Sequence, residues 1–362
     1  MKRLALTCSC AAVLLAACVV PASAGSFEVV ACDAAPGGAN NSWITSATSD
    51  RVAAYTLCPA GIGDTRGIVT RNAVLQGGNA GAWQSARATF YAPPGTTISG
   101  IRASYLFFRE GGEWFAGLST GSNGLDGCYA GTGRCERREA DRFLPVPNTQ
   151  QIFIETTCYG GFCPMASSGD ADRNYAKATA RMSSARVTVQ DDQLPSIVDV
   201  GGSLLSEGWK RGVQTVSFDA RDNVGIRETS LSAGKGFARK ASECDNTRPV
   251  PCPQGRVSYN NFDTTLVGTD GHQVMSVRAV DAAGNTHSEN TQVSVDNSAP
   301  AGPQDPAVAG GGVAGHQQLP ADMAKPRSDG GGANRGRCLR AVPHGRGAVR
   351  ARSQGSGRHR DH

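Results

Sequence analysis

The sequence predicts an all-β protein built from two successive β-sandwiches and ending in a disordered tail. The 362 residues include 46 glycines, a content that favours many turns over long helices. The clearest strand lies in the stretch 270–285, which turn signals bound at both ends. Met275, Val277 and Ala279 share one face of this stretch, and polar residues occupy the other. Such alternation is typical of a strand that packs on one side and meets water on the other.

The first 24 residues are predicted to be an export signal. Lys2 and Arg3 provide a charged start, Leu4 to Val20 an apolar region, and Ala22-Ser23-Ala24 a small-residue cleavage site. The alternative is a lipobox ending at Cys18, which would make that cysteine a lipid anchor. Either interpretation makes the mature protein secreted or bound to the cell surface. After residue 24 no stretch is long and apolar enough to predict a transmembrane helix.

Export places the protein in an oxidising compartment, and its cysteines fit that placement. Eight cysteines lie in the body of the chain, and six of them form three pairs that are close in sequence. The predicted disulfides are Cys32–Cys58, Cys128–Cys135, Cys158–Cys163 and Cys244–Cys252. Sequence spacing favours these pairs but does not fix the connectivity. A metal site is disfavoured, because neither CxxC spacing nor an accompanying histidine is present.

Residues 25–192 are predicted to form one domain, a jelly-roll-like β-sandwich. Six alternating or aromatic-rich runs predict strands: Phe27–Ala31, Gly67–Val74, Ala86–Tyr91, Ile101–Arg109, Gln151–Thr157 and Ala180–Gln190. The charged segment 136–142 is expected to be one helical turn or a charged loop, and a solvated face without a further role is the favoured interpretation. The domain resembles lectin-type and carbohydrate-binding sandwiches in architecture, and no motif makes that match specific.

Residues 191–195 are predicted to be a linker, and residues 198–298 a second β-sandwich. Five features carry a resemblance: the alternating run Val213–Ala220, the turn 222–225, Asp270-Gly271-His272, the stretch 279–285 and Val295-Asp296-Asn297. Together they resemble the bacterial immunoglobulin-like repeats of secreted and cell-surface proteins. Such repeats usually carry Tyr or Thr where this chain has His272. The resemblance implies an immunoglobulin-like fold and a role as a spacer or adhesion module.

Residues 299–362 form a Gly- and Arg-rich tail that is predicted to be disordered. No aromatic residue other than histidine follows Phe262, so a packed core is not available there. We interpret the tail as the product of a shifted reading frame, because reading 313–337 out of frame by one base gives a strand-like stretch with two tryptophans. The alternative is an arginine-rich segment that binds polyanions.

The net charge argues against a nucleic-acid partner. Residues 327–362 hold nine arginines and two aspartates, a charge of +7, and Lys2 and Arg3 add +2. Because the whole chain carries +5, residues 4–326 carry −4. A mildly acidic body offers no electrostatic footprint for DNA or RNA.

The sequence predicts no enzyme and no cofactor. The predicted first domain contains no histidine, which removes Ser-His-Asp and Cys-His catalysis from it. Glu110 and Glu113 flank a Gly-Gly turn instead of sharing one strand face, so a glycosidase with paired carboxylates is only a weak alternative.

Two sets of residues are candidates for ligand binding. Trp83, Trp114, Phe115 and Tyr129 lie beside Gly-rich sequence and would suit stacking on sugars. A packing role for the two tryptophans is the favoured alternative. Weaker candidates for Ca²⁺ are Asp219, Asp222, Asp281 and Asp296, for which Asx-turns are the favoured alternative.

We therefore expect a secreted or cell-surface binding or adhesion protein that is not an enzyme. Its first domain is the expected binding module, with a surface glycan or another extracellular ligand as the partner. The alternatives are a structural surface spacer without a ligand of its own and, more weakly, a glycoside hydrolase.

Overall fold

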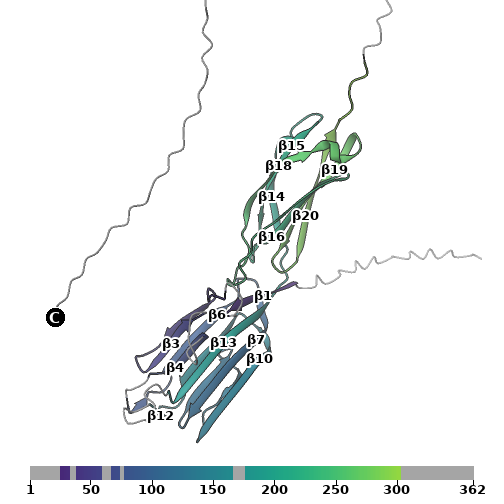
Figure 1. Cartoon of the computed structure of the whole chain (residues 1–362). Helices are drawn as coiled ribbons and strands as arrows, with labels where there is room; N and C mark the ends of the chain where they lie inside the picture. The colour runs from purple at the N-terminus through teal and green to yellow at the C-terminus, as the bar shows by residue number, and fades with distance from the viewer. Residues whose placement is uncertain (1–24, 33–37, 59–66, 74–76, 166–175, 303–362) are drawn as a thin grey trace, which may run out of the picture. The chain divides into compact units, whose positions relative to one another are not determined.

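The computed structural model describes residues 25–32, 38–58, 67–73, 77–165 and 176–302, and this part of the chain is built from β-strands (Figure 1). Its helical elements are two short 3-10 turns, Ser203–Leu205 and Thr264–Val267. The predicted all-β fold is thus confirmed. No helix among these residues has the length and hydropathy needed to cross a membrane. The predicted export signal with Cys18 and nearly all of the predicted tail lie outside the described residues.

Two antiparallel sheets face each other in the first part of the chain. The larger has the strand order β10 (Arg134–Thr149), β7 (Thr97–Glu110), β13 (Ala178–Asp191), β4 (Gly67–Asn72), β3 (Val52–Leu57), and β1 (Gly25–Ala31) also pairs with β13. The smaller has the order β2 (Trp43–Ala47), β6 (Ser85–Tyr91), β11 (Gln151–Cys158), β8 (Trp114–Ser119), β9 (Gly124–Cys128). A short ribbon pairs β5 (Asn79–Ala80) with β12 (Cys163–Pro164).

Alternating apolar residues from both sheets fill the space between them. Ile101, Phe107 and Val187 of the larger sheet and Leu118 and Ile154 of the smaller belong to one buried cluster. This is the packing of a β-sandwich, in which every second residue of a strand enters the core.

Polar groups also join the two sheets inside the core. The hydroxyl oxygens of Thr70 and Thr156 lie 3.1 Å apart, and the Tyr105 hydroxyl donates to the Asp126 carboxylate. Burial, with the Asp126 carboxylate, raises the pKa of Tyr105. The phenol therefore stays protonated and keeps donating across the interior.

Four disulfides are present among the described residues, and they are the four pairs that the sequence predicts: Cys32–Cys58, Cys128–Cys135, Cys158–Cys163 and Cys244–Cys252. Two of them close short loops that follow β9 and β11. Cys158–Cys163 encloses residues 159–162, and Cys128–Cys135 joins the end of β9 to the start of β10.

Residues 196–295 form a second pair of antiparallel sheets. One has the order β14 (Ser196–Gly201), β15 (Val213–Arg221), β18 (Gly255–Asp263), and the other β17 (Gly236–Ala241), β16 (Ile226–Ala233), β19 (Gly271–Asp281), β20 (Thr286–Val295). Met275, Val277 and Ala279 of β19 are buried against Val216 and Phe218 of β15 in a second core cluster. The stretch 270–285 is therefore the strand that its alternation predicts, followed by a turn.

Two expectations are wrong. Segment 136–142 is the solvated face that was expected, but it is neither a loop nor a helical turn: it is part of β10, which pairs with β7. Because β10 lies at the edge of its sheet, water solvates its charged side chains, and edge charges also deter pairing with other chains. Asp191 is not a linker residue. It is the last residue of β13 and is buried, because it continues the core-facing series of Val187 and Val189.

Candidate functional site

The face of the five-stranded sheet that is directed away from the core carries polar and aromatic side chains, and we call it the outer face. Along β11, Ile152 and Ile154 enter the core, so Phe153, Glu155 and Thr157 lie on the opposite side. The register extends this face across the sheet. Thr157 pairs with Ser85 and Phe115, and Glu155 with Arg87 and Gly117.

Four aromatic rings form a continuous row at one end of the outer face. The ring centroids of Trp83 and Tyr159 are 5.5 Å apart, those of Tyr159 and Phe115 5.9 Å, and those of Phe115 and Tyr129 5.3 Å. Trp83, Tyr129 and Tyr159 are 67%, 53% and 39% exposed, whereas Phe115, the ring that connects Tyr159 to Tyr129, is buried. We call these four residues the aromatic row.

Glycines beneath the rings allow them to lie against the sheet. A Cβ at Gly117 would come 2.8 Å from Cζ of Phe115, and one at Gly127 would come 2.9 Å from its Cε2. A Cβ at Gly124 would come 2.6 Å from the Tyr129 hydroxyl oxygen. These contacts are closer than real side chains tolerate, so glycine at these positions of β8 and β9 is what makes room for Phe115 and Tyr129.

Trp83 is held in an unusual backbone conformation. Its φ is 66°, in the left-handed region that costs a residue with a side chain about 1–2 kcal/mol. Hydrogen bonds maintain the conformation: its amide donates to the Cys158 carbonyl at 2.6 Å, and the Gln84 amide donates to the Gly81 carbonyl at 3.3 Å. A strained residue that presents an exposed indole is typical of a functional position.

An ion pair lies beside the aromatic row. The Glu155 carboxylate, only 2% exposed, accepts from Arg87 Nε at 2.7 Å, from Thr157 Oγ1 at 3.1 Å and from the Ser119 hydroxyl. Burial, and then the negative charge of Glu155, raise the pKa of Tyr159. The phenol of Tyr159 is therefore a stable hydrogen-bond donor at neutral pH. Arg87 remains partly exposed and also presents N–H groups at this face.

The four aromatic residues that the sequence singles out have different environments. Trp83 and Tyr129 are exposed, and the buried Phe115 connects Tyr129 to Tyr159. Trp114 is fully buried, and its indole N–H donates to the Pro164 carbonyl at 3.0 Å, so it anchors the disulfide-closed loop that carries Tyr159. For Trp114 the packing alternative is the correct one.

Sequence reasoning missed two exposed aromatic residues in the loop that the Cys158–Cys163 disulfide closes. Tyr159 and Phe162 lie between Cys158 and Cys163 and beside Gly160-Gly161. The criterion that singled out Trp83, an aromatic residue next to Gly-rich loop sequence, applies to both of them and would have found them.

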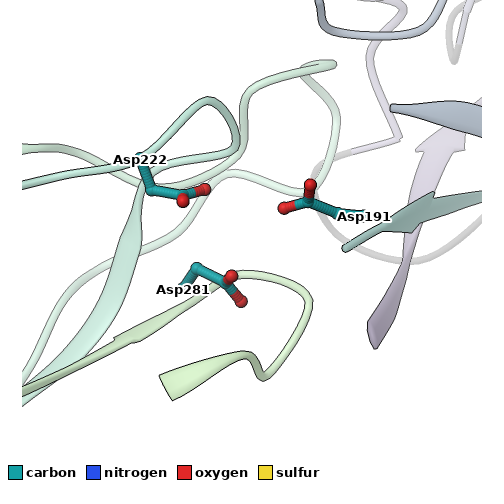
Figure 2. Close-up of side chains that lie close together, drawn as sticks. All are labelled: Asp191, Asp222 and Asp281. Carbon is teal, nitrogen blue, oxygen red and sulfur yellow. The ribbon is translucent and has the colours of Figure 1, made fainter. Parts of the chain in front are cut away.

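The structure also brings together three carboxylates, two of which the sequence singles out. Asp222 and Asp281 meet Asp191, with one oxygen of each lying within 4.8 Å of the others (Figure 2). The other two candidates lie elsewhere. Asp219 pairs with Arg221 at 2.9 Å, and Asp296 accepts from the Ser298 amide at 3.1 Å. Asx-turns are present as well, because Asp222 Oδ1 accepts from the Val224 amide.

No protein-family model matches the chain, and no curated protein matches it either. The resemblance of residues 198–298 to immunoglobulin-like repeats therefore stays a prediction, whereas a β-sandwich there is observed.

Solved structures give only weak similarities. The glycoside hydrolase domain of Endo-D from Streptococcus pneumoniae R6 is 10% identical over 70% of this chain and 37% of that chain, with a TM-score of 0.20. A GH2 beta-galacturonidase from Eisenbergiella tayi is 10% identical over 69% and 44%, with a TM-score of 0.17. The adhesin domain of Epf from Streptococcus pyogenes is 8% identical over 78% and 94%, with a TM-score of 0.28. The chain spans less than half the length of the two hydrolase structures, and none of these likenesses carries an argument about function.

Proposed function

We propose that this chain is an exported, non-enzymatic binding or adhesion protein whose first β-sandwich binds a glycan on its outer face. The observation that carries the proposal is the aromatic row, in which exposed rings of Trp83 and Tyr159 contact each other and the buried Phe115 connects Tyr159 to the exposed Tyr129. Aromatic rings offer a flat apolar surface for the C–H faces of sugars, and their hydroxyl and indole N–H groups hydrogen-bond to sugar hydroxyls.

The surroundings of the row favour a ligand with many hydroxyl groups. Arg87 supplies N–H donors, and Tyr129 and Tyr159 supply hydroxyls next to apolar rings. A purely hydrophobic partner would leave these polar groups without hydrogen bonds, which costs free energy. A sugar chain satisfies both the rings and the polar groups.

Rigidity supports the same proposal. Phe115 and Tyr129 pack closely against sheet glycines, and the Cys158–Cys163 disulfide closes the loop of Tyr159. Rings that are already held in place lose little conformational entropy when a ligand binds, so even a small contact area gives measurable affinity.

A non-enzymatic role is supported by the engagement of the nearest carboxylates. Glu155 is held by Arg87, Ser119 and Thr157, and Glu113 Oε2 accepts from the Phe162 amide at 3.2 Å. Both groups thus maintain the local structure. Hydrolysis of a glycosidic bond needs a pair of carboxyl groups that are available to the substrate.

The test is a glycan array probed with the purified full chain, followed by calorimetric titration of the best glycan. Trp83→Ala and Tyr129→Ala should each weaken binding about tenfold, equivalent to about 1.4 kcal/mol. Phe143→Ala is the matched control, because Phe143 is an exposed aromatic on β10 of the other sheet. Absence of binding to any glycan would favour the structural spacer. Release of reducing sugar from a bound glycan would favour the hydrolase.

A further inference from the structure

We propose that Asp191, Asp222 and Asp281 form a Ca²⁺ site. This inference concerns residues outside the aromatic row and does not rest on glycan binding. Asp191 ends β13, Asp222 lies in the turn between β15 and β16, and Asp281 ends β19. The three carboxylates point toward one another (Figure 2).

The spacing of the oxygens suits calcium. One oxygen from each carboxylate lies within 4.8 Å of the other two. Ca²⁺ holds oxygen ligands at about 2.3–2.6 Å, so ligands on opposite sides of the ion lie about 4.6–5.2 Å apart. Mg²⁺ usually keeps several waters and takes one or two carboxylates, so three protein carboxylates favour the larger ion. A site of carboxylate oxygens alone also suits a hard cation better than a transition metal.

A second observation points to a cation independently of the clustering. Asp191 is only 1% exposed, and its Oδ2 has no hydrogen-bond partner. Its Oδ1 accepts from the Gln193 amide and from Asn223 Nδ2, both at 3.2 Å. A carboxylate oxygen that is buried without a donor is costly, and native proteins rarely leave one. The figure shows this carboxylate directed at the other two, where a cation would pair with it.

No positively charged side chain among the described residues pairs with the three carboxylates. In the part of the chain that the structure describes, no ion pair involves Asp191, Asp222 or Asp281. The three carboxylates thus repel one another at a largely buried position, and a divalent cation would replace this repulsion with attraction.

The ligands are already oriented. Asp281 Oδ1 accepts from the amides of Gly284 and Asn285 at 2.6 and 2.9 Å, and its Oδ2 accepts from Asn285 Nδ2 at 2.8 Å. Asn285 Nδ2 also donates to the Asp191 carbonyl at 3.0 Å. The same asparagine therefore connects two of the three ligands, so little conformational freedom is lost when the ion binds.

The test uses the full chain, stripped of metal with EDTA and titrated with CaCl₂ or MgCl₂. Binding with a Kd near 10⁻⁴ M, within the range of extracellular calcium modules, should raise Tm by about 5 °C in 5 mM CaCl₂. MgCl₂ at the same concentration should give a clearly smaller rise. No rise with CaCl₂, or an equal rise with MgCl₂, would overturn the proposal.

Two variants make the test specific to the site. Asp222→Asn should reduce Ca²⁺ affinity measured by calorimetry at least tenfold, while its metal-free Tm stays equal to or above that of the wild type. This variant is expected to fold, because the asparagine oxygen can still accept from the Val224 amide and because one repelling charge is removed. Asp219→Asn is the control: it also removes one negative charge, from a residue of β15 that is not a proposed ligand, and it should keep the full Ca²⁺ response. A wild-type response in Asp222→Asn, or an equal loss in Asp219→Asn, would refute the assignment.

Discussion

Replacing Arg87 with alanine is expected to destabilise the protein by about 3 kcal/mol. Glu155 is almost completely buried, and Arg87 is its only cationic partner among the described residues. Removing one member of a buried pair leaves an uncompensated charge, which costs about 3–5 kcal/mol. The value here falls at the low end, because Arg87 is 39% exposed and because Ser119 and Thr157 still donate to the carboxylate.

Arg102 provides a matched control in the same β-sandwich. Like Arg87, it pairs with a carboxylate, that of Asp141 at 3.3 Å, and lies over a phenylalanine ring, that of Phe143. The corresponding ring for Arg87 is that of Phe153. The pairs differ mainly in burial, since both members of the Arg102 pair are exposed. Arg102→Ala should therefore cost less than about 1 kcal/mol.

Urea unfolding with intact disulfides measures both costs, and thermal unfolding should show Tm lowered by about 6–12 °C for Arg87→Ala. Adding Glu155→Gln to Arg87→Ala should recover at least about 1.5 kcal/mol, because the unpaired charge is then absent. The reasoning is refuted if Arg87→Ala costs no more than Arg102→Ala, or if the double variant shows no recovery.

Two further predictions follow from the environments of single residues. Trp114→Ala should lower the free energy of unfolding, measured with urea, by about 4 kcal/mol, because a fully buried indole is lost. Trp83→Gly should change it by less than about 1 kcal/mol, because relief of the positive φ offsets the lost contacts. Similar costs for the two variants would contradict this reasoning. Hydrogen bonds from the Asn297 amide and then from Ser298 lower the pKa of Asp270 below its usual 3.8. Its stabilising effect is thus present above the unfolded pKa and is lost as pH falls through the folded pKa. Asp270→Asn should melt below the wild type at pH 7 and together with it at about pH 2, and a gap that persists in acid would contradict the assignment.

Much of the architecture was predictable because strand alternation and turn residues are local signals. The strand of Met275, Val277 and Ala279 and the six predicted runs of the first part correspond to observed strands. Segment 136–142 escaped prediction because its charges follow from its place at a sheet edge, which depends on the pairing partner and not on the segment itself.

The candidate sites were predictable only in part. Trp83 and Trp114 have similar Gly-rich surroundings in the sequence, yet one indole is exposed and the other fully buried. Their difference is set by neighbours that are distant in the chain, such as Pro164 for Trp114. Asp191 is separated by 31 and 90 residues from the two carboxylates that it meets, so no local pattern marks it as their partner.

The sequence by itself determined the all-β class, many of the core strands and the four cysteine pairs, because those properties depend largely on neighbouring residues. Only the tertiary structure decided which aromatic rings reach the surface and which carboxylates converge. Exposure and convergence depend on strand order and register. These bring Phe115 of β8 together with the loops before β6 and after β9 and β11 in the aromatic row, and the ends of β13 and β19 together with the turn after β15 at the three carboxylates.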